Sequence, residues 1–150
     1  MGKRRFIMML LTISACSLTI DASSQAQSNS LCMLTDSQRA HNRSRIWSDF
    51  EFSTDEMGGP MAFNSERCWQ AAVDASEDYL ANGPILSVRE QAITLFHMAR
   101  NLARTGDHRG AARLAAAARR SDQQDDAPLD WNGYVTGFHA YLSGHRNLLS

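Results

Sequence analysis

The side chains best suited to chemistry in this chain of 150 residues are its five histidines, its three cysteines and its arginines. His97 and His108 flank one predicted helical hairpin, and His139 and His145 lie six residues apart. A zinc site usually places two ligands closer together, for example four residues apart on a helix, with a third nearby. Neither pair has that spacing, so the histidines are expected at or near the surface. The sequence predicts no metal site and no cofactor.

The sequence also lacks the patterns of nucleophilic or carboxylate catalysis. No G-x-S-x-G motif occurs. Glu77 with Asp78, and Asp125 with Asp126, are neighbouring carboxylates on an expected exposed helix face or in an expected loop. Acidic side chains in such places are usually just solvated. We therefore assign no catalytic residue from the sequence.

One helix face carries side chains that could bind an anion. His97, Arg100, Asn101 and Arg104 recur at spacings of three and four residues, which places them on the same side of a helix. Arginine binds a carboxylate through two parallel hydrogen bonds. If the helix lines a groove, this face is the predicted binding site for an acidic peptide. The alternative is an ordinary solvated helix face.

The first 26 residues follow the order of a secretory signal peptide. Three basic residues at positions 3–5 precede an apolar run over 6–15, too short to be a permanent membrane span, and small and polar residues come next. Cleavage after Ala26 would release residues 27–150 as one domain to the periplasm or the medium. In the alternative, Ile13–Cys16 resembles a lipobox, and a lipid on Cys16 would anchor the protein to the membrane.

The charge and the cysteines of residues 27–150 fit an exported protein that does not bind nucleic acid. Removal of the signal peptide takes away three of 15 basic and one of 16 acidic residues, so the net charge moves from −1 to −3. A nucleic-acid interface needs a basic surface instead. Cys32 and Cys68 remain, and an even number of cysteines in an oxidising compartment favours a disulfide. Two free thiols or an incomplete metal pair are the alternatives.

Apolar residues recur at spacings of three and four along most of the remaining chain, which predicts helices and no strands. A sparse pattern suggests a helix over 35–52, and a Gly-Gly-Pro sequence predicts a loop over 53–64. A helix is expected from Ser65 to Gly83, with Gly83 in a left-handed conformation. A second helix with a capping box is expected over 87–106, and a third begins at Asp107. The last helix is expected to begin near Pro128 and to end at Gly144. Its aromatic stripe, Trp131, Tyr134, Phe138 and Tyr141, is expected in the core with the tyrosine hydroxyls at the rim.

The stretch from Ala92 to Ala118 resembles a tetratricopeptide repeat. Gly106, Asp107 and His108 occupy its Gly-Asp-aromatic turn, and small side chains follow where the second helix packs on the first. The repeat-like unit covers about 88–120, and residues 129–150 resemble a degraded second copy. The resemblance implies antiparallel hairpins and protein–protein contact through a concave surface, and it implies no catalytic residue.

These patterns predict an all-α fold of antiparallel, tetratricopeptide-like helical hairpins after an N-terminal signal peptide. The predicted function is a non-catalytic protein–protein interaction module of the bacterial envelope, with a protein or peptide partner. Two alternatives stay open: an accessory lipoprotein anchored through Cys16, and a small ligand-binding domain or enzyme. The second alternative would need a polar pocket in which His, Asp or Arg side chains converge.

Overall fold

The structure is a computed structural model that describes residues 32–144, and this range holds seven helices and no strand. The predicted all-α class is confirmed for it. The expected signal peptide over 1–26, the candidate lipidation site Cys16 and residues 145–150 of the expected second repeat lie outside the described residues. Within 32–144, none of the helices combines the length and the apolar character that a membrane span requires.

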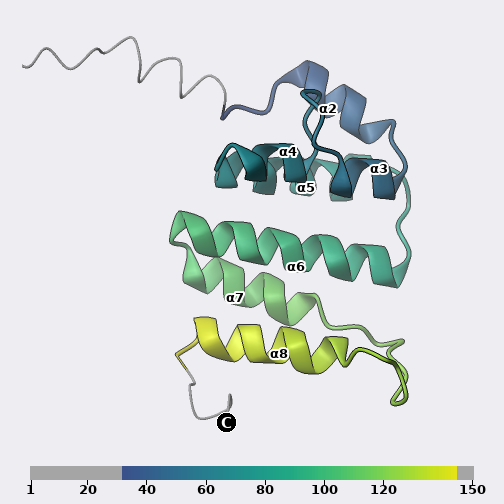
Figure 1. Cartoon of the computed structure of the whole chain (residues 1–150), viewed down its shortest axis with the longest axis vertical. Coiled ribbons are helices and arrows are strands. Elements are labelled where there is room, and N and C mark those ends of the chain that lie inside the picture. The colour runs from purple at the N-terminus through teal and green to yellow at the C-terminus, as the bar shows by residue number, and fades with distance from the viewer. Residues whose placement is uncertain (1–31, 145–150) are drawn as a thin grey trace, which may run out of the picture.

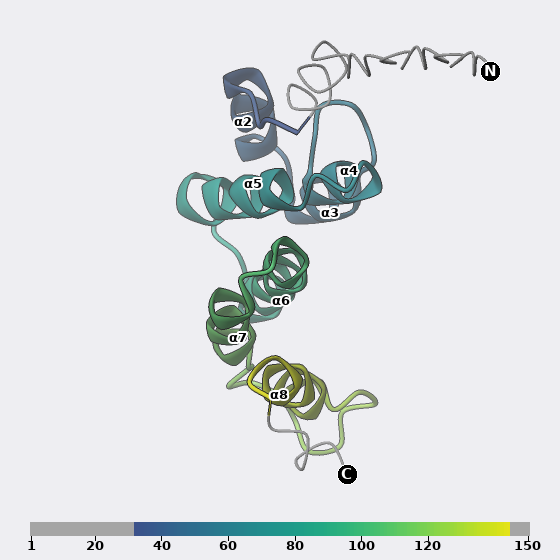
Figure 2. The same cartoon turned by 90° about the vertical axis from the view of Figure 1, so that its left-hand side faces the viewer.

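The helices stack in layers along the long axis of the molecule (Figures 1 and 2). At one end, α2 (Asp36–Arg43) lies over a layer formed by α3 (Trp47–Phe52), α4 (Pro60–Ser65) and α5 (Trp69–Asn82). α5 is the longest helix of this layer and packs against both α2 and α4. The layer therefore serves as a platform on which the rest of the chain is built.

The second half of the chain is a series of antiparallel helices (Figure 1). α6 (Val88–Thr105) runs back beneath α5, α7 (His108–Ala117) returns along α6, and α8 (Trp131–Leu142) returns along α7. α6 packs on both α5 and α7 and so joins the two halves. The predicted arrangement of antiparallel hairpins fits these contacts, whereas the likeness to a tetratricopeptide repeat stays a prediction.

The α6–α7 hairpin forms as the local sequence predicts, with a capping box at the start of α6 and a tight turn between the two helices. The Ser87 hydroxyl accepts a hydrogen bond from the Glu90 N–H, and the Glu90 carboxylate accepts one from the Ser87 N–H at 2.8 Å. Gly106 ends α6 with φ of 99°, a left-handed conformation that favours glycine. Asp107 then caps α7 by accepting a hydrogen bond from the Gly110 N–H at 2.8 Å. Local chemistry therefore sets both ends of the turn.

The first half differs from the sequence prediction. The helix expected over 35–52 is divided into α2 and α3, because the chain turns at 44–46 and the Arg45 carbonyl there accepts a hydrogen bond from the Tyr79 hydroxyl at 2.9 Å. The loop expected over 53–64 contains α4, since Pro60 takes the first helical position, where no N–H is needed. The expectation that Gly58, Gly59 and Pro60 would keep this segment free of helix was therefore wrong.

Two further expectations were wrong at the edges of helices. Gly83 ends α5 in an extended conformation with φ of −86°, not in the expected left-handed one. α8 places only part of its aromatic stripe in the core: Trp131 and Phe138 pack against a buried cluster, but the rings of Tyr134 and Tyr141 are more than half exposed. The α8 helix covers α7 on one side and has no further helix beyond it among the described residues.

The apolar core consists of two separate clusters. In the platform, Phe50 stacks on Tyr79 with ring centroids 3.8 Å apart, and Phe63 and the alanines of α5 complete the packing. The second cluster lies around Phe96, with Val135 of α8 against it. α6 packs on α5 and α7 and turns Phe96 toward the aromatic rings of α8, whereas Thr94 and His97 on its side toward α3 are polar. This polar junction holds the candidate site.

The predicted disulfide is confirmed, with the Cα atoms of Cys32 and Cys68 5.0 Å apart. Cys68 is also the N-terminal cap residue of α5. The bond therefore ties the start of the described chain to the platform. A disulfide of this kind is compatible with an extracellular or periplasmic location.

Replacing both cysteines, in a Cys32→Ser/Cys68→Ser variant, should lower the free energy of unfolding by about 3–4 kcal/mol, because the loop closed across 36 positions would regain its entropy in the unfolded chain. Urea denaturation of the oxidised protein and of the variant measures the difference. Reduction of the parent protein with dithiothreitol should give the same loss. Equal stability of oxidised and reduced protein would contradict this role.

An ion pair holds α2 on α5. Arg43 donates two hydrogen bonds to the Asp78 carboxylate, one of them from Nε at 2.8 Å, and the Asp78 side chain is 7% exposed. The hydrogen bond from Arg43 outweighs the effect of burial and lowers the pKa of Asp78 below its ordinary value. Asp78, expected to be solvated, is thus a structural anchor.

This ion pair should make the free energy of unfolding depend on pH in the acidic range. Because the pKa of Asp78 is lower in the folded than in the unfolded chain, its contribution is complete above the unfolded value of about 3.9 and is lost as the pH falls through the folded value. The stability gap between the parent protein and Asp78→Asn, measured by urea denaturation, should therefore narrow from about pH 7 to about pH 3. Asp125→Asn, in an exposed loop, is the control. A gap that stays constant would show that Asp78 does not contribute through its charge.

Candidate functional site

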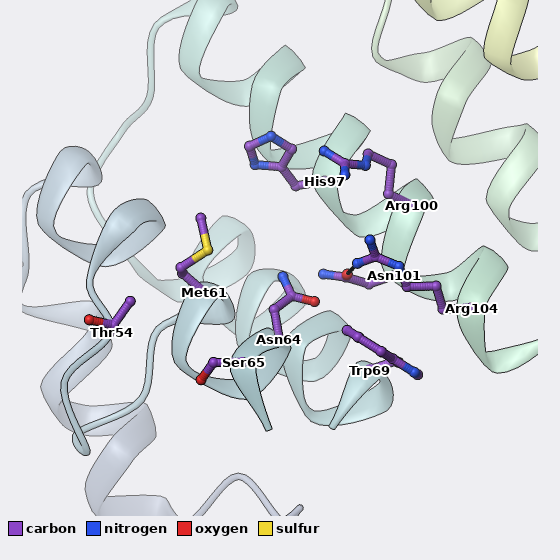
Figure 3. Close-up of a pocket in the computed structure, with 9 residues that line it drawn as sticks. All are labelled: Thr54, Met61, Asn64, Ser65, Trp69, His97, Arg100, Asn101 and Arg104. Atoms are coloured by element: carbon purple, nitrogen blue, oxygen red, sulfur yellow. Dashed lines mark hydrogen bonds between the residues drawn. The ribbon is translucent and has the colours of Figure 1, made fainter. Parts of the chain in front are cut away.

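A cleft of about 350 Å³ between α4, the start of α5 and α6 brings together all four side chains that the sequence singled out (Figure 3). His97, Arg100, Asn101 and Arg104 form the α6 wall. The opposite wall comes from the segment before α4, from α4 itself and from the first residue of α5: Thr54, Met61, Asn64, Ser65 and Trp69. The four residues therefore share one site, and their role in binding stays a prediction.

The α6 wall is more than the solvated face considered as the alternative. Asn101 is 1% exposed and the side chain of His97 is 26% exposed, whereas Arg100 and Arg104 are exposed at the rim. α4, a helix that the sequence did not predict, supplies part of the wall that faces these residues. Figure 3 shows the Arg100 guanidinium at the same end of the cleft as the His97 ring.

Two amide side chains leave unpaired polar atoms in the cleft. The buried Asn101 Nδ2 has no hydrogen-bond partner among the described residues, and the same is true of the buried Asn64 Oδ1. Figure 3 shows the two amides facing each other from α6 and α4. Leaving a buried polar group unpaired costs about 1–3 kcal/mol, and such groups usually bind water or a ligand. One donor and one acceptor are therefore left unpaired in the wall of the cleft.

The arginines give the cleft a positive rim. Arg104 donates a hydrogen bond from Nη1 to Asn101 Oδ1 at 3.3 Å, and its guanidinium carbon lies 4.6 Å from the centre of the Trp69 ring. This cation–π contact keeps the guanidinium above the cleft wall. Among the residues that line the cleft, none is acidic. The site is therefore suited to an anion.

Behind His97 lies a buried carboxylate that the sequence analysis did not single out. Glu51 of α3 is 1% exposed, and its Oε1 lies 2.6 Å from His97 Nδ1. Its Oε2 accepts a hydrogen bond from Thr94 Oγ1 at 2.9 Å, and Trp47 Nε1 donates in turn to Thr94 Oγ1 at 2.9 Å. This network joins α3 to α6 and fixes the orientation of the imidazole.

The network also sets which nitrogen of the imidazole is available. A carboxylate only accepts hydrogen bonds, so His97 Nδ1 is the donor in this pair. In the neutral ring the other nitrogen, Nε2, is then an acceptor. Nε2 makes no hydrogen bond within residues 32–144. It is therefore free to accept a hydrogen bond from water or from a ligand.

Other candidates of the sequence analysis lie away from this cleft. The described part of the chain contains no group of three or more His, Cys, Asp and Glu side chains that could hold a metal ion. His108 is exposed at the start of α7, and His139 is half-buried in α8. His145 lies outside the described residues. Among the histidines that the structure describes, His97 alone lines the cleft.

Comparison with protein-family models, with curated protein sequences and with solved structures finds no match to this chain. The function is therefore argued from the chemistry of the cleft.

Thr94→Val should destabilise the protein by about 1–3 kcal/mol, because it keeps the shape of the side chain but leaves the buried Glu51 carboxylate without one of its donors. Thermal or urea denaturation measures the effect. Thr136→Val in α8 is the matched control, since Thr136 is exposed. If the two variants lose the same stability, the network does not hold α3 on α6 in the way described.

Proposed function

We propose that this protein is an exported binding module that takes an acidic segment of a partner protein into the cleft between α4 and α6. The observation that carries the proposal is the composition of the cleft. His97, Arg100 and Arg104 line it without any acidic residue, and the buried Asn101 amide offers an unused donor beside them. The arginines would bind a carboxylate through parallel hydrogen bonds.

The size and the walls of the cleft favour one carboxylate-bearing side chain or chain end over a larger element. Its volume of about 350 Å³ is near the lower end of the range of ligand sites, about 300–1,000 Å³. A whole helix does not fit such a space, whereas a glutamate side chain does. Met61 and Trp69 offer an apolar wall for its methylene groups. The partner would therefore present an extended acidic segment.

The location of this module follows from the signal-peptide pattern and the disulfide. Both support export across a bacterial inner membrane, and the disulfide needs an oxidising compartment to persist. If the chain instead carries a lipid on Cys16, the same cleft would bind its partner at a membrane surface. Mass spectrometry of the mature N-terminus distinguishes the two forms. The binding chemistry is the same in both.

A fluorescent peptide with a short run of glutamates should bind the protein, and its glutamine counterpart should not. Arg104→Gln should weaken the binding about 10- to 100-fold, because a hydrogen bond to a charged group contributes about 1.5–3 kcal/mol. Fluorescence anisotropy at low salt measures both affinities. The proposal is wrong if the glutamine peptide binds equally well.

Arg109→Gln is the control for this experiment, since Arg109 is exposed on α7 and does not line the cleft. It lowers the net charge by the same amount as Arg104→Gln and should leave the affinity unchanged. Equal losses in both variants would point to a non-specific charge effect. The melting temperatures of both variants show whether the loss of the contact between Arg104 and Trp69 alters the fold.

A further inference from the structure

The pairing of Glu51 with His97 has the geometry of an oriented general base. A buried carboxylate holds Nδ1 of an imidazole at 2.6 Å, the carboxylate is itself fixed by Thr94, and the imidazole reaches a polar cleft. In enzymes that use a histidine base, a buried carboxylate in this position selects the tautomer and stabilises the imidazolium that forms. An imidazole that only binds an anion has no need of a buried negative charge behind it.

The cleft brings together a histidine and two arginines, the kinds of side chain that an enzyme of this type would need. His97, Arg100 and Arg104 come from successive turns of one rigid helix, α6. Along the helix axis, Arg100 lies about 4.5 Å from His97 and Arg104 about 10 Å, at 1.5 Å per residue. A small molecule whose carboxylate binds Arg104 would therefore place its other end beside His97.

We propose that this cleft hydrolyses carboxylic esters that carry a second, free carboxylate. His97 is the general base, Glu51 is its positioning residue, and Arg104 with Arg100 holds the free carboxylate. The inference shares the anion site of the proposed function and adds an activity to it. The substrate class follows from the distance along α6 between the arginines and the histidine.

Water is the nucleophile in this scheme. Of the two hydroxyl side chains that line the cleft, Ser65 donates its proton to the Ala62 carbonyl at 2.6 Å, and Thr54 lies on the wall opposite α6 (Figure 3). His97 Nε2 takes a proton from water as the water oxygen forms a bond to the ester carbonyl carbon. The carbonyl oxygen becomes negative, and the unpaired Asn101 Nδ2–H is the donor that stabilises it.

The second half of the reaction restores the histidine. The tetrahedral intermediate collapses and the bond between the carbonyl carbon and the alcohol oxygen breaks. The imidazolium of His97 returns its proton to the leaving alkoxide. One water is consumed, and the products are a carboxylic acid and an alcohol. No oxidant, reductant or metal is needed for this balance.

Two probe substrates that differ only in charge test the proposal: 4-acetoxybenzoate and methyl 4-acetoxybenzoate. The first carries a free carboxylate across the ring from its acetyl ester, and in the second that carboxylate is masked. Release of the phenol is followed by absorbance. We expect kcat/KM to be at least about 10-fold higher for the charged ester, since an interaction with Arg104 is available to it alone. Arg104→Gln should remove that preference by raising KM for the charged ester only.

The base is tested with His97→Gln, which should lower kcat about 100-fold or more while KM changes little. His108→Gln, exposed on α7 and outside the cleft, is the control for the background activity of surface histidines. Glu51→Gln keeps the size of the side chain but removes its charge. Through His97 it should lower kcat and shift the pH–rate profile, effects that a purely structural role would not produce.

The outcomes separate the two proposals. If the ester is hydrolysed no faster by the parent protein than by His97→Gln, the inference is overturned, and binding of the glutamate peptide decides the proposed function independently. If hydrolysis depends on His97 but the glutamate peptide neither binds nor inhibits it, the inference holds and the cleft serves a small-molecule substrate instead. Equal rates for the charged and the masked ester would overturn the substrate class.

Discussion

A carboxylate that is almost completely withdrawn from water constrains the whole centre of this protein. A buried carboxylate such as Glu51 needs hydrogen bonds that replace its hydration, and Thr94 and His97 of α6 provide them. α3 and α6 must therefore dock in one register. That register fixes the α6 wall of the cleft and orients the imidazole of His97. It also leaves polar side chains of α6 facing α4 across the cleft. The binding and the hydrolysis proposed above both depend on it.

The other wall depends on a close backbone approach. A Cβ atom at Gly59 would lie 2.1 Å from the Phe50 carbonyl oxygen, so only glycine lets the chain pass α3 at this point and begin α4 at Pro60. At the other end of the segment 59–68, the disulfide links Cys68, the N-terminal cap residue of α5, to Cys32. A short helix fixed at both ends is a rigid support for the cleft. Sites built on such elements hold their geometry better than sites on loops.

The parts of the fold that the sequence predicts are those set by local chemistry. The capping box at Ser87, the left-handed Gly106 and the cap at Asp107 each need only neighbouring residues, so the α6–α7 hairpin is recognisable from the pattern alone. The disulfide follows from the even number of cysteines after the predicted signal peptide. The four polar residues of α6 follow from helical periodicity.

Contacts between distant segments account for what the sequence missed. The turn that divides α2 from α3 depends on a hydrogen bond between Arg45 and Tyr79, which are 34 positions apart. Glu51 gives no signal of burial in the sequence, because its partners lie 43 and 46 positions away. The wall that faces Asn101 includes α4, a short helix behind a Gly-Gly-Pro sequence that usually indicates a loop. Periodicity grouped the four polar residues on one face of α6 but could not show what lies opposite that face.

The most direct test of this account is the protonation of the His97 ring, observed by long-range ¹H–¹⁵N NMR in mildly alkaline buffer. The account predicts that the neutral ring carries its proton on Nδ1, that this proton exchanges slowly because it is hydrogen-bonded to Glu51, and that Glu51→Ala abolishes the protection. A ring with its proton on Nε2, or one unaffected by the loss of Glu51, would contradict the claim that a buried carboxylate organises the cleft.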